Sequence, residues 1–271
     1  RAGRFYAYHT NGKEVKKMVR RVIFFLLTVC LLAAVTPVMA RTLEEVMAEM
    51  EKGAANLKDV KGTQIVKFML EKEMVTVKNN FVAKTPNKFR AETSIPIPGT
   101  KKTQKVLTVC DGTTIWQETM APEERKVIRM KLSDVAGKLD EYQQKILGSG
   151  AGMVGAEALV KLANADYDLK VTGQVTHGGK AMDVLEGKLK GSAKPGQMTL
   201  PTPAKIKYLV GAADGFVYKV EGWDKAGKSI LEISYENIKF NTGVPDKTFS
   251  YTPPKKVEVV DAAEVAPYVI K

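Results

Sequence analysis

The chain has few of the residues on which common active sites depend. It contains two cysteines and two histidines in 271 residues. After residue 40, Cys110 is the one cysteine, so that part of the chain can form no internal disulfide bond. His177 is the one histidine there, and it stands beside two glycines, where a hairpin turn is expected rather than a metal site. The sequence therefore predicts no metal, no cofactor and no catalytic residue, and hence a protein that is not an enzyme.

Runs of basic residues interleaved with aromatic residues are also absent, although the formal net charge is +12. Half of this excess lies in residues 1–40, and the basic residues after residue 40 are spread along the chain. Such a distribution predicts a solvated basic surface and no nucleic-acid partner.

An apolar run lies near the N-terminus. Arg20 and Arg21 precede the apolar stretch 22–35, Pro37 follows it, and Val38-Met39-Ala40 places small residues at −3 and −1 of a cleavage site. This order is typical of a secretory signal peptide over 18–40, with a mature domain over 41–271 outside the cytoplasm. Residues 1–17 are then a mis-annotated upstream extension. The alternative is an uncleaved membrane anchor, since a spanning helix needs about 20 apolar residues.

The mature part begins with a helical pattern and continues with strands. The capping box Thr42-x-x-Glu45 and the apolar spacing after it predict a helix over 42–58. Beyond it apolar residues alternate, and turn sequences such as Asp111-Gly112, for which we expect a type I′ turn, separate the runs. The predicted strands include 106–110, 114–119, 169–175, 182–189, 205–210, 216–221 and 230–240, the last with a bulge near Glu236-Asn237.

The middle of the chain returns to helical spacing. Leu132, Val135, Leu139, Tyr142 and Ile146 predict an amphipathic helix, and the glycine-rich segment 148–155 predicts a hinge. Gly150-x-Gly152-x-x-Gly155 matches the dinucleotide fingerprint as a string, but a helix rather than a strand precedes it, so nucleotide binding is not expected. We expect one mainly β (α+β) domain, with a curved antiparallel sheet and helices on one face.

The predicted strands supply more large apolar side chains than one short helix can cover. Methionine is also frequent, and its flexible side chain suits surfaces that accept varied apolar ligands. A sheet curved around a cavity would use this surplus to hold a lipid. By strand parity, the candidate lining residues are Phe68, Phe81, Phe89, Trp116, Ile206, Tyr208, Phe216, Tyr218, Leu231, Ile233 and Tyr235. A one-residue slip reverses a strand, so the side on which each of them lies stays open.

Three segments resemble the LolA family of periplasmic lipoprotein carriers. Residues 81–90 (FVAKTPNKFR) resemble its strand–turn–strand with a Lys-Arg-Pro-Asn-like turn, and residues 106–116 resemble its following Asp-Gly hairpin. Residues 249–261 resemble its closing segment, in which two prolines precede an alternating valine run. The order and spacing of the segments agree over most of residues 42–261.

The resemblance implies an incomplete antiparallel β-barrel, or half-barrel, whose apolar cavity takes acyl chains beneath a helical lid. The lid would be formed by Leu132, Val135, Leu139, Tyr142 and Ile146. It also implies a periplasmic location. Thr85 stands where the family carries an arginine that tethers the lid, and a hydroxyl cannot replace a guanidinium that forms several charge-assisted hydrogen bonds. This departure puts the family's lid cycle, and lipoprotein as the cargo, in question.

The leading hypothesis is a monomeric periplasmic carrier, or chaperone, that binds acyl chains of lipoproteins or lipids and transfers them between envelope membranes. Its partners would be donor and acceptor proteins of the inner and outer membranes. One alternative is a sensor or interaction module of the cell envelope that binds lipid or protein without transport. Another is an envelope structural protein with a filled core.

Overall fold

The computed structural model describes residues 41–70, 72–97, 99–100, 102–121, 124–136, 160, 163–191 and 202–262. The described residues all lie in one compact unit, Ala40–Lys271. The predicted extension 1–17 and signal peptide 18–40 lie outside them. Within the described ranges, no helix combines the length and the apolar character needed to span a bilayer.

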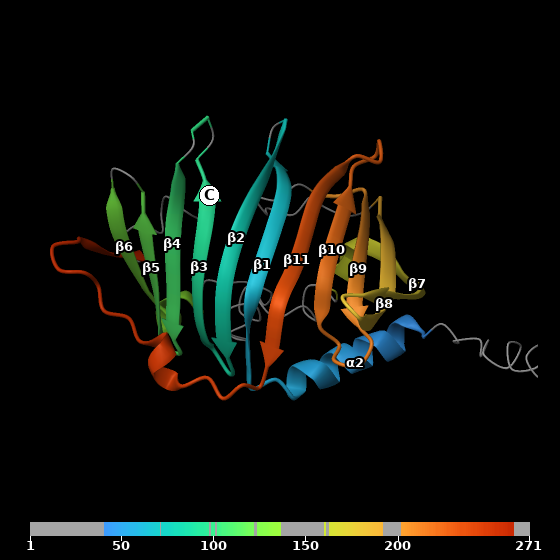
Figure 1. Ribbon diagram of the computed structural model, residues 1–271, viewed down its shortest axis with the longest axis horizontal. Coiled ribbons are helices and arrows are strands. Elements are labelled where there is room, and N and C mark those ends of the chain that lie inside the picture. Colours follow the sequence, from blue (N-terminus) through green and yellow to red (C-terminus); the bar gives the residue numbers. More distant parts are fainter. Residues whose placement is uncertain are drawn as a thin grey trace, which may run out of the picture. The chain divides into compact units, whose positions relative to one another are not determined.

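One sheet of twelve strands dominates the described part of the chain (Figure 1). Its order is β12-β6-β5-β4-β3-β2-β1-β11-β10-β9-β8-β7. The first meander comprises β1 (Asp59–Leu70), β2 (Glu73–Lys84), β3 (Lys88–Pro96), β4 (Thr103–Asp111), β5 (Thr114–Met120) and β6 (Arg125–Lys131). The second comprises β7 (Tyr167–His177), β8 (Lys180–Leu189), β9 (Lys205–Gly211), β10 (Val217–Trp223) and β11 (Ser229–Phe240).

The two meanders are joined by antiparallel pairing of β1 with β11. The short strand β12 (Val259–Asp261) adds to the outer edge of β6 in parallel. Because β12 and β7 stand at opposite ends of the order, the sheet is open. The predicted mainly β, largely antiparallel and unclosed architecture is confirmed, while the parallel strand β12 was not expected from the sequence.

A line of charged residues and a line of apolar residues lie on opposite faces of the sheet where β1, β11, β10, β9 and β8 run side by side. Side chains directly opposite one another across strands point to the same face. One such line of residues is Lys67, Glu232, Glu221, Lys207 and Glu186. The line beside it, on the other face, is Val66, Ile233, Val220, Tyr208 and Leu185. On the charged face the lysine and glutamate side chains pair across strands, as between Lys67 and Glu232 at 2.9 Å.

Helix α2 (Leu43–Ala55) covers part of the apolar face. Its capping box is present, because Glu45 N donates to Thr42 Oγ1 at 3.2 Å and Thr42 N donates to the Glu45 carboxylate at 2.8 Å. Val46 and Met50 are buried in one cluster with residues that include Leu185, Tyr208 and Val220. The helix predicted over 42–58 is therefore confirmed, although it ends at Ala55. Figure 1 shows it beside the lower ends of β9 and β10.

Local turn chemistry was predicted well, with one correction. The bulge expected near Glu236-Asn237 is present, with a register shift between β1 and β11 and a positive φ of 55° at Asn237. The type I′ turn expected at Asp111-Gly112 is wrong. Within this turn only Gly112 has positive φ, at 107°, whereas type I′ requires positive φ at both central residues. Instead, the Asp111 carboxylate accepts hydrogen bonds from the backbone N–H groups of Thr113 and Thr114.

Of the predicted lid, only the beginning is described. Helix α3 (Leu132–Ala136) contains Leu132 and Val135, and Leu132 N donates to the Thr113 carbonyl at 2.9 Å. Leu139, Tyr142, Ile146 and the predicted hinge at 148–155 lie outside the described residues. The helical lid and the cavity beneath it stay predictions.

Candidate functional site

The apolar face continues along the upper parts of β1, β2 and β11 in Figure 1, toward the β1–β2 turn. Val66 stands opposite Val77 and Ile233, and Phe68 stands opposite Val75 and Leu231. We call these six residues the apolar strip. Leu231 is buried and the other five are half-buried, while Leu70, next on the same face, is 45% exposed. The described residues therefore leave most of the strip partly exposed, and Ile233 packs against the cluster under α2.

A row of polar side chains crosses the same face immediately below the strip. Gln64 stands opposite both Tyr235 and Asn79, and Asn79 stands opposite Thr93. We call these four residues the polar row. Thr93 Oγ1 donates to Asn79 Oδ1 at 3.2 Å, and Asn79 Nδ2 donates to Gln64 Oε1 at 3.5 Å. Gln64 Nε2 donates in turn to the Tyr235 hydroxyl at 2.8 Å, so the row is a connected chain of hydrogen bonds across four strands.

Below the polar row the face is closed by aromatic rings. Phe216 contacts Tyr218, Tyr235 and Phe240 edge to face, with ring centroids 5.1, 5.2 and 5.3 Å apart. Phe81 contacts Tyr235 in the same geometry at 6.2 Å. Such edge-to-face pairs add to the stabilisation from buried area alone. Phe89 packs against this cluster as a partly buried residue. The lower part of the face is thus filled by the protein's own side chains.

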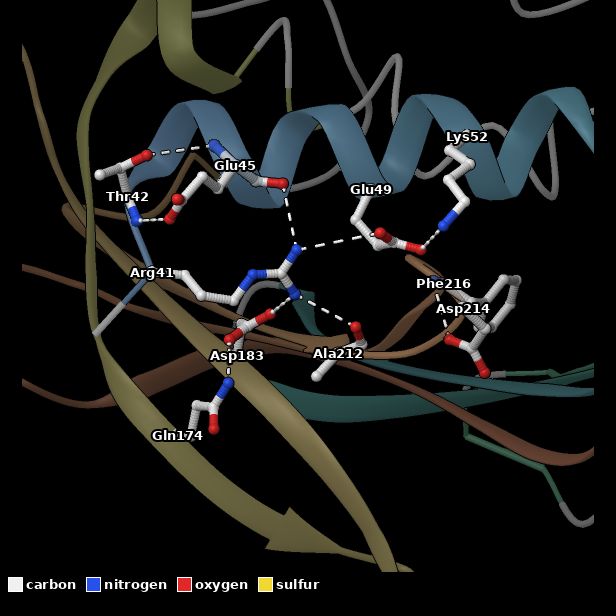
Figure 2. A network of polar contacts seen from close by, with 10 residues as sticks. All are labelled: Arg41, Thr42, Glu45, Glu49, Lys52, Gln174, Asp183, Ala212, Asp214 and Phe216. Atoms are coloured by element: carbon white, nitrogen blue, oxygen red, sulfur yellow. Dashed lines mark hydrogen bonds and ion pairs between the residues drawn. The ribbon is translucent and has the colours of Figure 1, made fainter. Parts of the chain in front are cut away.

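The face below α2 is filled in the same way. Ile206 and Tyr208 are 6% and 4% exposed, and both lie in the cluster with Val46 and Met50. The helix is held over them by Arg41, which Figure 2 shows reaching from the start of α2 to β8. The Arg41 guanidinium donates to the buried carboxylate of Asp183 at 2.9 Å and to the Ala212 carbonyl at 3.1 Å. Gln174 Nε2 donates to the second Asp183 oxygen at 2.7 Å.

Trp116 lies on the opposite face of the sheet from Phe89. Trp116 stands opposite Val109, whereas Phe89 stands opposite Cys110, and neighbouring residues along β4 point to opposite sides. The indole ring contacts Tyr251 at 5.5 Å, and the Tyr251 hydroxyl donates to the buried Glu118 carboxylate at 2.9 Å. Burial raises the pKa of the Tyr251 hydroxyl to about 12, and Glu118 adds to the shift. Trp116 therefore helps to hold the segment around Tyr251 against the sheet.

A buried carboxylate joins the start of β1 to the segment that follows β11. Asp59, at the start of β1, is 3% exposed and accepts hydrogen bonds from Thr242 N at 2.8 Å and Gly243 N at 2.9 Å. Burial on its own raises the pKa of Asp59, but these hydrogen bonds outweigh it and the pKa is lowered. Thr85, at the family's arginine position, donates its hydroxyl to the Lys58 carbonyl at 3.2 Å. This threonine therefore joins the β2–β3 turn to the same junction.

The structure divides the eleven candidate lining residues into five groups. Phe68, Leu231 and Ile233 lie in the apolar strip, and Tyr235 lies in the polar row. Phe81, Phe89, Phe216 and Tyr218 belong to or pack against the aromatic cluster, Ile206 and Tyr208 lie under α2, and Trp116 lies on the other face. Contact of any of them with a lipid stays a prediction.

Sequence reasoning missed the residues that complete the strip and the row. Val66 has the same strand parity as Phe68, so the alternating pattern was sufficient to find it. Gln64, Asn79 and Thr93 gave no such signal, because each is an ordinary polar residue until strand pairing aligns it with the others.

No family model matches the chain. A curated protein of Methanocaldococcus jannaschii, itself uncharacterized, is 21% identical over 219 residues, which cover 81% of this chain and 54% of that protein. The chain thus spans about half the length of the curated relative that it matches.

Several solved structures are similar. An uncharacterized conserved protein from Thermus thermophilus has a TM-score of 0.48 at 15% identity, covering 80% of this chain and 98% of its own. MucB of Pseudomonas aeruginosa, solved in complex with MucA, has a TM-score of 0.42 at 11% identity, covering 77% of this chain and 60% of its own. A LolA superfamily protein from Nitrosomonas europaea has a TM-score of 0.30 at 13% identity, covering 78% and 99%.

Proposed function

We propose that this protein binds the acyl chains of lipids or lipoproteins on the apolar strip and carries them between envelope membranes in the periplasm. The single observation that carries the proposal is the strip itself. It is a half-buried apolar surface on one face of a sheet whose other face carries paired charges. Protection of an acyl chain from water contributes about 0.8 kcal/mol for each buried methylene.

The chemistry of the strip supports a binding role. Its six side chains are all aliphatic or aromatic, so they offer contact area and no acid, base or nucleophile. The sequence resemblance to LolA carriers and the predicted signal peptide support the same role and the same compartment. Because apolar contact alone has no built-in means of release, we also expect donor and acceptor partners that change the access to the strip.

Native mass spectrometry of the protein purified from the cell envelope tests this proposal. We expect a protein population that is heavier by the mass of one or more lipids, and loss of that mass on extraction with organic solvent. A matched pair of variants assigns the site. Val77→Glu places a charge in the strip, whereas Thr76→Glu places it on the opposite face of the same strand. The Val77→Glu variant is expected to purify without lipid, and the Thr76→Glu variant is expected to retain it. A wild-type protein that carries no lipid and binds no apolar dye would contradict the proposal.

A further inference from the structure

The polar row lies between two apolar regions on one face of the sheet. Above it are the rows that contain Val66 and Phe68, and below it is the row in which Gly62 stands opposite Phe81. Tyr235 contacts the aromatic cluster through its ring while its hydroxyl reaches the row. The row places four hydrogen-bonding side chains in line on an otherwise apolar surface. Because polar groups buried there lose their hydration, we expect the row to have a role beyond packing.

The hydrogen bonds of the row all run in one direction. Thr93 donates to Asn79, Asn79 donates to Gln64, and Gln64 donates to Tyr235. The chain therefore ends on a phenol oxygen that accepts a hydrogen bond and still holds its own hydrogen. Gln64 likewise has a second amide hydrogen, because its nitrogen carries two and uses one for Tyr235. Both ends of this Gln64–Tyr235 pair can thus donate to a further acceptor.

The remaining donor hydrogens of Tyr235 and Gln64 indicate a ligand group that accepts hydrogen bonds and donates none. Burial raises the pKa of the Tyr235 hydroxyl more than the hydrogen bond from Gln64 lowers it, so the phenol keeps its hydrogen at neutral pH. A carbonyl oxygen has two lone pairs and no hydrogen, and therefore matches two donor atoms that lie 2.8 Å apart. Successive rows on one face are about 7 Å apart, so a chain that starts at the row and follows the strands passes both rows of the strip.

We propose that Tyr235 and Gln64, oriented by Asn79 and Thr93, recognise the ester carbonyl of an acyl lipid whose hydrocarbon chain lies on the apolar strip. This inference rests on the proposed function, since it assumes that the strip holds an acyl chain. It adds selectivity: ester-linked lipids bind more tightly than ether-linked lipids of the same chain length and headgroup. Asn79 and Thr93 are positioning residues, which hold the Gln64 amide with its N–H groups toward the phenol.

The test compares binding of diester and diether phosphatidylglycerols with identical chains, measured by displacement of an apolar dye. The wild-type protein is expected to prefer the ester by about fivefold, the usual effect of one added hydrogen bond. Tyr235→Phe removes only the hydroxyl, and Gln64→Met removes the amide at similar volume. Each variant is expected to show a smaller preference for the ester lipid, because each removes one of the two donors.

Thr63→Val is the matched control. Thr63 is adjacent to Gln64 and donates to Asn80 at 2.9 Å, a comparable cross-strand bond on the opposite face. This variant should keep the fivefold preference. Equal binding of the two lipids by wild-type protein, or an unchanged preference in Tyr235→Phe, would overturn the inference and leave the proposed function intact. Displacement of dye by neither lipid would contradict the proposed function itself.

Discussion

At the scale of single residues, the described part of the chain shows how buried polar groups are matched to partners. Asp59 is enclosed by backbone N–H groups of the segment after β11, and Asp183 is paired with Arg41 and Gln174. Removal of one partner of such a group costs more than the bond contributes, because the other partner stays buried without compensation. Asp183 therefore holds the start of α2 to β8 through Arg41, and Asp59 holds the start of β1 to the segment after β11.

Asp59→Asn tests the first of these two carboxylates. The amide presents hydrogens to backbone N–H groups that need an acceptor, so we expect a loss of about 1–3 kcal/mol in the free energy of unfolding at pH 7. Because the pKa of Asp59 is lowered in the folded protein, its contribution is complete above the ordinary carboxyl pKa and is lost as pH falls through the lowered value. Urea unfolding at pH 7 and pH 3 should show a smaller difference in stability between wild type and variant at pH 3.

The exposed carboxylate of Asp134 provides the control for this experiment. Asp134→Asn should leave both the stability at pH 7 and its decline in acid as in the wild type. A difference between wild type and Asp59→Asn that is the same at both pH values would contradict the assigned role of the Asp59 charge.

At the scale of elements, helix α2 is docked by close backbone contact as well as by side chains. A Cβ atom at Gly53 would collide with the carbonyl oxygen of Asp214 in the β9–β10 turn. In the same turn, Gly215 has a φ of 64°, and a Cβ there would lie 2.6 Å from Met50 Cα. Glycine at both positions lets the helix approach the turn, and this approach places Val46 and Met50 in the cluster on the apolar face.

We therefore expect Gly53→Ala to lower the stability of the protein, although helix propensity alone would raise it. Alanine in place of glycine stabilises an undocked helix by about 0.5–1 kcal/mol. Here we expect destabilisation by about 1–3 kcal/mol, the usual cost of overpacking, measured by urea unfolding. Lys52→Ala, at the neighbouring exposed position, should change stability by less than about 0.5 kcal/mol. Stabilisation by Gly53→Ala would show that α2 does not dock against this turn.

The elements themselves were predictable where the signal is local. The capping box at Thr42 and Glu45 indicated where α2 begins, and the change of parity at Glu236-Asn237 indicated the bulge in β11. Pairing between distant segments was not predictable in the same way. The partners of Gln64 on either side are Asn79 and Tyr235, and nothing in the sequence near Gln64 indicates that Tyr235 stands beside it. The polar row could therefore not be found, and the face on which Trp116 lies stayed open.

At the scale of the whole sheet, the pairing of β1 with β11 makes one continuous surface from two meanders. The charged line through Lys67 and the apolar line through Val66 run on opposite faces of that surface. This separation leads to the central claim, that an acyl chain lies on the apolar strip of β1, β2 and β11. The lower part of the same face is closed by the aromatic cluster and by α2.

The most direct test of this claim is photocrosslinking with a phosphatidylglycerol that carries a diazirine in one acyl chain, followed by mapping of the labelled residues by mass spectrometry. The claim predicts labels at alternating positions, on Val66, Phe68, Val75, Val77, Leu231 and Ile233, and none on Lys67 or Glu232 between them. Labels that fall on the charged face, or that show no alternation along β1 and β11, would contradict it.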